Sequence, residues 1–91
     1  MNYEIFYVDK VVKNDIPKIS NSYKDHIKQA IETKLMTEPN LYGKPLRKSL
    51  KGYFKLRVGN YRIIFRIENK KVKIFVIAHR RIVYGIMGGR T

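Results

Sequence analysis

The stretch spanning residues 51–84, KGYFKLRVGNYRIIFRIENKKVKIFVIAHRRIVY, decides the fold. Within it, apolar and polar residues alternate in three runs, and the pairs Gly59-Asn60 and Asn69-Lys70 separate these runs. Alternation with a period of two is typical of half-buried strands, and a two-residue turn signal between such runs is typical of a β-hairpin. The sequence therefore predicts a three-stranded antiparallel meander with strands at residues 51–58, 61–68 and 71–78.

Two-residue turns fix which residues lie opposite one another in the meander. The first turn places Arg57 opposite Arg62, and the second places Val76 opposite Ile63. Because opposed residues share a face of a sheet, one predicted face is apolar and consists of Phe54, Leu56, Val58, Tyr61, Ile63, Phe65, Ile67, Val72, Ile74, Val76 and Ala78. The other predicted face is cationic and carries Tyr53, Lys55, Arg57, Arg62, Arg66, Lys71, Lys73 and His79, together with Ile64, Glu68, Phe75 and Ile77. On this face, Glu68 is expected to pair with Lys71.

Positive charge is concentrated in the half of the chain that contains the meander. The net charge is +13, and thirteen of the twenty basic residues lie from Leu46 onward, with Glu68 as the one acidic residue there. Two arginines opposite each other cost about 0.2–1 kcal/mol, which a bound anion would offset. The asymmetry points to a polyanion, interpreted here as nucleic acid. A solvated basic surface is the plain alternative, and an anionic membrane fits less well because no strongly amphipathic helix accompanies the charge.

Length and composition bound the class of protein. The chain has 91 residues, of which 44% are hydrophobic, and this fits one globular domain over residues 1–91. There is no cysteine, so a disulfide framework and a thiolate metal site are excluded, and a cytoplasmic location is expected. No run is long enough for an export signal or a membrane span.

The remaining sequence predicts one more strand and two helices. The strand, at residues 2–8, is expected to pair with a free edge of the meander. One helix is predicted at residues 10–16, ended or kinked by Pro17, and the other at about residues 23–37, where Ser22 and Asp25 resemble a capping box. Residues 38–51 are expected to form a loop and residues 85–91 a loose tail. The second helix has an apolar stripe that must pack on the apolar face, formed by Tyr23, Ile27, Ala30, Ile31 and Leu35.

The order strand, helix, helix, three strands, together with LYGKPL, KLRVGNYRIIFRI and HRRIVY, resembles the RelE/ParE superfamily of small toxins, and the RelE branch in particular. The resemblance implies an α+β, microbial-ribonuclease-like fold in which two N-terminal helices pack on one face of a mainly antiparallel four-stranded sheet. It also implies ribosome-dependent cleavage of mRNA in the A site without a metal or other cofactor. The implied partners are the ribosome with its mRNA and 16S rRNA, and a RelB-like antitoxin that wraps and neutralises the toxin.

Cleavage of RNA through its 2′-hydroxyl needs a base, an acid and cations that stabilise the charge on phosphorus. The meander has no pair of carboxylates, so lysine, arginine, histidine or tyrosine must supply these groups. The resemblance assigns Lys55 as the base, Arg62 as a phosphate ligand, Arg80 as the group that stabilises the transition state or protonates the leaving oxygen, and Tyr84 as a residue that orients substrate. Tyr53 stands where the RelE pattern has a second lysine, and His79 is the expected substitute. Further contacts with RNA are expected from Tyr53, Arg57, Arg66, Lys73, Arg47, Lys48, Lys51 and Arg81.

Other interpretations remain open at this point. Lys55 and Arg57 are also compatible with ordinary solvent-facing strand residues, and His79 with a residue that ends a strand. Tyr84 is also compatible with a packed side chain. For the whole chain, the alternatives are a ParE-like inhibitor of DNA gyrase and a module that binds RNA or the ribosome without cutting it.

Overall fold

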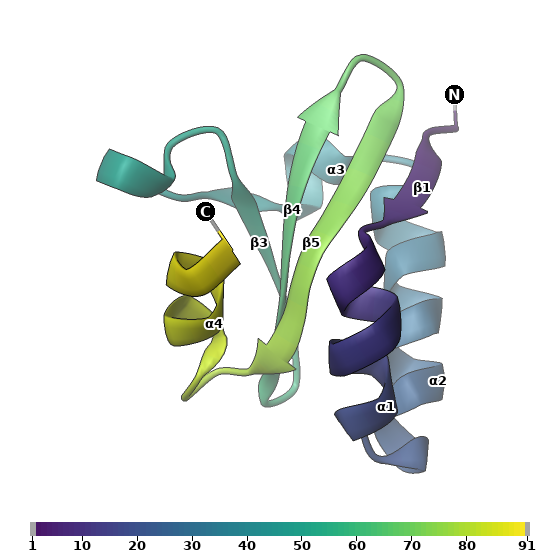
Figure 1. Cartoon of the computed structure of the whole chain (residues 1–91). Coiled ribbons are helices and arrows are strands. Elements are labelled where there is room, and N and C mark those ends of the chain that lie inside the picture. Colours follow the sequence, from purple (N-terminus) through teal and green to yellow (C-terminus); the bar gives the residue numbers. More distant parts are fainter. Residues whose placement is uncertain (1, 91) are drawn as a thin grey trace.

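The sheet predicted from the meander is the centre of the computed structural model, which describes residues 2–90. Five strands lie in the order β1-β5-β4-β3-β2, and β1 is parallel to β5 whereas the other neighbours are antiparallel (Figure 1). The predicted α+β class and the meander are confirmed. The fifth strand arises because the segment predicted as a loop adds a two-residue strand beside β3. The strands are β1 (Glu4–Tyr7), β2 (Lys44–Pro45), β3 (Phe54–Val58), β4 (Tyr61–Glu68) and β5 (Lys71–His79).

The register of the first hairpin is confirmed at every pair from Phe54↔Phe65 to Val58↔Tyr61. In the second hairpin it is confirmed only near the turn, where Phe65 lies opposite Ile74. A β-bulge follows, because Ile64 pairs with Val76 and leaves Phe75 as an extra residue in β5. An extra residue exchanges the two faces for the remainder of the strand.

This exchange corrects the predicted faces of the sheet. Ile77, not Val76, lies opposite Ile63, and His79, not Ala78, lies opposite Tyr61. Val76 and Ala78 therefore leave the predicted apolar face, and Ile77 and His79 leave the predicted cationic face.

The helices lie close to the predicted positions but differ at their ends. The first begins earlier and runs past Pro17, through a wide π-type turn, η1 (Val11–Asp15), and α1 (Ile16–Lys18). Pro17 lies in α1, directly after the π-type turn and near the C-terminal end of this continuous helix. The second helix starts after Ser20, not Ser22, and comprises α2 (Asn21–Ala30) and η2 (Ile31–Leu35). The segment predicted as a loop contains α3 (Pro39–Tyr42) and the 3₁₀ turn η3 (Lys48–Leu50), in addition to β2.

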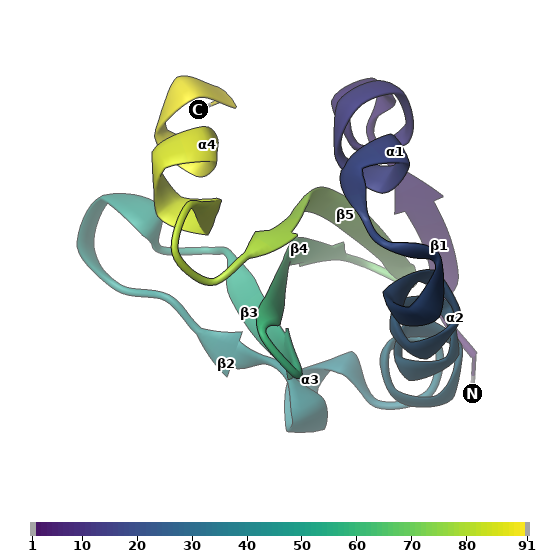
Figure 2. The same cartoon turned by 90° about the horizontal axis from the view of Figure 1, so that it is seen from below.

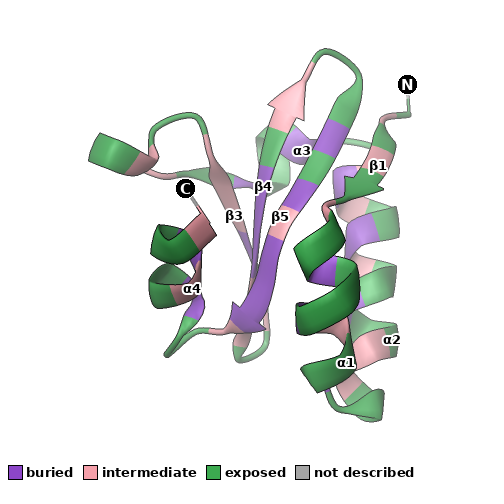
Figure 3. Cartoon of the chain, in the orientation of Figure 1, coloured by how far each residue is buried: buried purple, intermediate pink, exposed green. Residues whose placement is uncertain are grey.

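The main core lies between these helices and one face of the sheet (Figures 1 and 3). The predicted stripe of the second helix faces this core: Ile27, Ile31 and Leu35 are buried, and Tyr23 and Ala30 are half-buried. The sheet contributes Leu56, Ile63, Phe65, Val72, Ile74 and Ile77.

A second core lies on the other face and is covered by α4 (Val83–Arg90) (Figure 2). The prediction of a loose tail is therefore wrong for residues 85–90, and Thr91 lies outside the described residues. The physical reason is the bulge, which turns Val76 and Ala78 toward this face beside Ile64 and creates an apolar surface. Val83 and Met87 of α4 are fully buried on that surface. Within residues 2–90, no helix is long and apolar enough to cross a membrane.

Candidate active site

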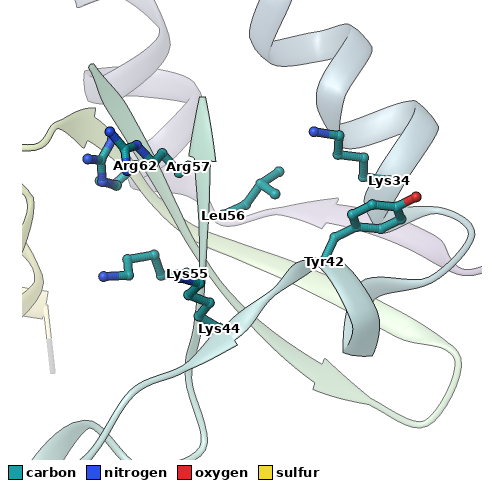
Figure 4. Close-up of a pocket in the computed structure, with 7 residues that line it drawn as sticks. All are labelled: Lys34, Tyr42, Lys44, Lys55, Leu56, Arg57 and Arg62. Atoms are coloured by element: carbon teal, nitrogen blue, oxygen red, sulfur yellow. The ribbon is translucent and has the colours of Figure 1, made fainter. Parts of the chain in front are cut away.

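Three basic side chains lie together near the Gly59-Asn60 turn: Lys55 and Arg57 of β3 and Arg62 of β4. Arg57 and Arg62 are cross-strand neighbours, as predicted, and all three side chains line one pocket of about 230 Å³ (Figure 4). Lys55 and Arg62 are half-buried, and Arg57 is exposed. No acidic side chain lines this pocket.

The turn itself orients Arg62. Its Nη1 donates hydrogen bonds to the carbonyl oxygens of Gly59 at 3.0 Å and Tyr61 at 2.9 Å. Gly59 has φ of +58°, a conformation that glycine adopts without strain, and a Cβ there would lie 3.0 Å from the ring of Tyr23. Desolvation lowers the pKa of Arg62 from its ordinary value, and the positive charges of Arg57 and Arg80 lower it further. Its guanidinium is thus held among like charges.

Arg80 and Tyr84 complete the group, which we call the basic cluster: Lys55, Arg57, Arg62, Arg80 and Tyr84. Arg80 follows β5, and its backbone N–H donates to the carbonyl oxygen of Asn60 at 2.8 Å, which ties the end of β5 to the turn beside Arg62. Tyr84 acts on the pKa of Arg62 in the opposite direction to Arg80, so both side chains lie within electrostatic reach of that guanidinium. Tyr84 is 44% exposed, whereas its neighbour Val83 is buried and anchors α4.

His79 does not join the basic cluster. Because of the bulge it lies opposite Tyr61, on the face of the sheet that carries the main core, and the two ring centroids are 6.0 Å apart. Its Nδ1 accepts a hydrogen bond from the backbone N–H of Arg81 at 3.2 Å. The expected substitute for a second lysine therefore lies on the face opposite Arg62.

The other predicted RNA-binding residues of the sheet form a separate group. The Arg66 guanidinium lies over the Tyr53 ring at 5.2 Å from its centroid, and Tyr53 itself packs on Phe75. Glu68 forms ion pairs with Arg66 at 3.7 Å and Lys73 at 3.3 Å, not with Lys71 as predicted. Arg66 follows Arg62 by four strand residues, about 13 Å. The charges of this group are thus partly neutralised and are remote from the basic cluster.

The remaining predicted RNA-binding residues lie on the periphery. The segment around η3 stands out from the sheet in Figure 1 and carries the exposed side chains of Arg47, Lys48 and Lys51. Lys48 has φ of +58°, an uncommon value for a residue with a side chain. Arg81 is exposed in the turn that precedes α4.

The sequence analysis missed three residues of the pocket: Lys34 of η2, Tyr42 of α3 and Lys44 of β2 (Figure 4). Lys44 lies opposite Lys55, and the Lys34 Nζ lies 5.6 Å from the centroid of the Tyr42 ring. Tyr42 and Lys44 both belong to the LYGKPL motif, which was the one available signal. Lys34 reaches the pocket only through the path of the chain over η2.

The chemistry available here is cationic and aromatic. The basic cluster can bind phosphate oxygens through arginine and lysine, which is the usual use of such side chains. Among residues 2–90, no three histidine or acidic side chains gather as metal ligands would.

Comparison with known structures identifies the class of protein that has this fold. The crystal structure of the toxin–antitoxin complex RelBE2 from Mycobacterium tuberculosis matches with a TM-score of 0.82 and 29% identity, over 88% of this chain and 100% of that one. The RelB–RelE antitoxin–toxin complex from Methanococcus jannaschii matches with a TM-score of 0.67 and 24% identity, over 89% and 96% of the two chains, and shows the fold alone. The fold is that of RelE-like toxins.

The sequence then gives the family. A family model described as "ParE toxin of type II toxin-antitoxin system, parDE" matches residues 4–84, and the chain belongs to this family within the RelE/ParE superfamily. Two M. tuberculosis proteins, Toxin RelG and Toxin RelE, are each 38% identical to the chain over 52 residues, 55% of its length. These matches cover 60% and 54% of the two relatives, so the chain spans little more than half of their length.

Proposed function

We propose that the chain is a RelE-type toxin that cleaves mRNA in the A site of translating ribosomes and so inhibits translation. The observation that carries this proposal is the convergence of Lys55 of β3, Arg62 of β4, Arg80 of the turn after β5 and Tyr84 of α4 at one end of the sheet. The names of the relatives, Toxin RelG and Toxin RelE, support the same branch.

The proposed reaction assigns one role to each residue. Lys55 accepts the proton of the ribose 2′-hydroxyl as its oxygen forms a bond to phosphorus. Arg62 and Arg57 bind the non-bridging oxygens, where negative charge increases in the transition state. Arg80 stabilises that charge or protonates the leaving 5′-oxygen as the phosphorus–oxygen bond breaks, which leaves a 2′,3′-cyclic phosphate and a 5′-hydroxyl. Tyr84 orients the neighbouring base through its exposed ring. All four steps use side chains alone.

The proposal also includes the setting in which the toxin works. A cytoplasmic location gives access to ribosomes. The thirteen basic residues from Leu46 onward are complementary to the negative charge of 16S rRNA and mRNA. The similar structures were solved with RelB-type antitoxins, and we expect a RelB-like partner to bind and neutralise this chain. The chain itself is expected to act as one domain over residues 1–91.

A second candidate is inhibition of DNA gyrase, favoured by the ParE description of the matching family. A gyrase inhibitor has no need for a lysine and three arginines grouped at one end of the sheet. The basic cluster therefore favours RNA cleavage over this candidate.

The test is 5′-end mapping of a defined mRNA after incubation with purified protein, with and without programmed ribosomes. New ends within the A-site codon, dependent on ribosomes and lost in Arg62→Ala, are the expected result. Lys13→Ala is the matched control, because Lys13 is exposed on η1, which packs on the opposite face of the sheet. Intact mRNA together with inhibition of gyrase supercoiling would replace this proposal by the second candidate.

A further inference from the structure

The pocket beside the basic cluster continues around the edge of β3. In Figure 4, Lys55 and Arg62 lie on one side of β3, and Tyr42 and Lys34 lie on the other. The pocket opens here because β2 has only two residues, which pair with Phe54 and Lys55 and leave the rest of the edge of β3 without a strand neighbour among residues 2–90. The basic cluster and the far side of β3 therefore share one continuous cavity.

The lining of this cavity combines three properties. It is strongly cationic, with Lys34, Lys44, Lys55, Arg57 and Arg62, and none of these five forms an ion pair with another described residue. It contains an aromatic ring, Tyr42, which is 44% exposed. Its one aliphatic side chain, Leu56, is only 4% exposed.

These properties match a nucleotide better than an acidic protein segment. Bases of single-stranded RNA stack on exposed aromatic rings while cations bind the backbone. A docked peptide would need an apolar anchor pocket, and the nearly buried Leu56 is too little exposed to form one. In addition, an RNA strand whose phosphate lies at Arg62 has an open path along the same cavity to Tyr42.

We propose that Tyr42, Lys34 and Lys44 form a second nucleotide subsite for single-stranded RNA, beyond the two nucleotides whose shared phosphate lies at Arg62. Tyr42 stacks on the base of the adjoining nucleotide, and Lys34 and Lys44 contact its phosphate from opposite sides. The proposal rests on the proposed function only in taking RNA as the ligand, and it requires no cleavage.

Binding of a non-cleavable probe tests the subsite directly. The probes are 2′-O-methyl RNA oligonucleotides of two and four nucleotides, measured by fluorescence anisotropy at several salt concentrations. We expect Tyr42→Ala to weaken binding of the four-nucleotide probe at least fivefold, as loss of a stacked base does, and to leave binding of the two-nucleotide probe unchanged. Tyr42→Phe, which keeps the ring, should bind as the wild type does.

The lysines have their own readout. Lys34→Gln combined with Lys44→Gln should lower the slope of log K against log salt by about 0.7 for each lost phosphate contact in a single strand. Leu41→Ala is the matched control, because Leu41 neighbours Tyr42 on α3, is 69% exposed and does not line the cavity. A melting temperature equal to that of the wild type, measured for the lysine variant and for Tyr42→Phe, shows that the fold of each variant is intact.

The outcomes separate this proposal from the proposed function. Equal affinity of Tyr42→Ala and wild type for the four-nucleotide probe, or equal losses for both probe lengths, would overturn the subsite even if mRNA is cleaved on ribosomes. Ring-dependent binding without any cleavage of mRNA would support the subsite and refute the nuclease. If a polyglutamate peptide displaces the probe, and if binding of that peptide requires the Tyr42 ring, the cavity is a site for a protein partner and the proposal is overturned.

Discussion

Asp15 and Arg90, 75 residues apart in the chain, form a buried two-bond ion pair. Arg90 Nη2 lies 2.6 Å from Asp15 Oδ1, and Arg90 Nη1 lies 2.8 Å from Asp15 Oδ2. The Arg90 side chain is 9% exposed and the Asp15 side chain is 4% exposed. The pair also supplies hydrogen-bond partners to backbone groups of β5 that lie beyond the end of β1. Asp15 accepts from the Ile77 backbone N–H at 2.9 Å, and Arg90 donates to the Phe75 carbonyl oxygen at 3.0 Å. It thus fastens α4, which carries Tyr84, to η1.

Removing one member of this pair should be strongly destabilising. Asp15→Ala leaves the Arg90 guanidinium buried without a counter-charge, and we expect it to lower the free energy of unfolding by about 3–5 kcal/mol. Urea denaturation measures the change, with Asp9→Ala as the control, because Asp9 is exposed in the same helical segment. A loss below about 1 kcal/mol would mean that α4 does not depend on the pair.

Arg80 and Arg81 provide a comparison between neighbouring residues. Of these two exposed residues, only Arg80 contributes to the lowered pKa of Arg62 in the basic cluster. We expect Arg80→Ala to lower ribosome-dependent cleavage at least about 100-fold, which is typical for loss of one donor to a developing anion, and Arg81→Ala to act mainly through weaker, salt-dependent binding. Single-turnover cleavage rates of the two variants, measured with equal amounts of folded protein, test this difference. Equal losses in both variants would argue for general charge rather than a positioned arginine.

His79 should not contribute proton transfer, because its ring lies against Tyr61 on the face opposite Arg62. We expect His79→Gln to retain the shape of the pH–rate profile between pH 5.5 and 8. A histidine that acts as acid or base would give a limb in this pH range. If that limb is present in the wild type and absent in the variant, His79 belongs to the active site in the ribosome-bound state.

Substitution by alanine should lower the stability of the protein at Gly43 and raise it at Gly85. A Cβ on Gly43 would clash with Phe65 Cζ and lie 2.9 Å from the Pro39 carbonyl oxygen, and the Phe65 ring is fully buried. At Gly85, inside α4, a Cβ meets open space. We expect Gly43→Ala to lower the melting temperature and Gly85→Ala to raise stability by about 0.4–1 kcal/mol, because alanine restricts the unfolded chain. A stabilising Gly43→Ala would contradict the packing around Phe65.

Periodicity in the sequence predicted most of the sheet because alternation reports directly on which side chains share a face. It succeeded from Phe54 to Ile74 and failed after Phe75. No glycine or proline marks the bulge, so nothing in the local pattern distinguishes Phe75 from an ordinary strand residue. Contacts distant in sequence accompany the bulge, among them the hydrogen bond that the Ile77 backbone N–H donates to Asp15.

The helix α4 was missed for a related reason. Its glycines, Gly85, Gly88 and Gly89, disfavour a helix in isolation. Burial of Val83 and Met87 on the surface that the bulge creates overrides that preference. Of the basic cluster, the strand residues were predicted from register, but their association with Arg80 and Tyr84 rested on family resemblance, because Arg80 lies in a turn and Tyr84 in the helix that was missed.

The two-residue length of β2 has a consequence for the behaviour of the protein in solution. A strand edge with unpaired backbone groups is a template for pairing with another chain, and charged side chains along it oppose such association. The uncovered edge of β3 is surrounded by three cations, Lys44, Lys55 and Arg57. A second copy that approaches this edge carries the same positive charges and is repelled. Replacing several of these cations at once should therefore cause self-association before it unfolds the protein.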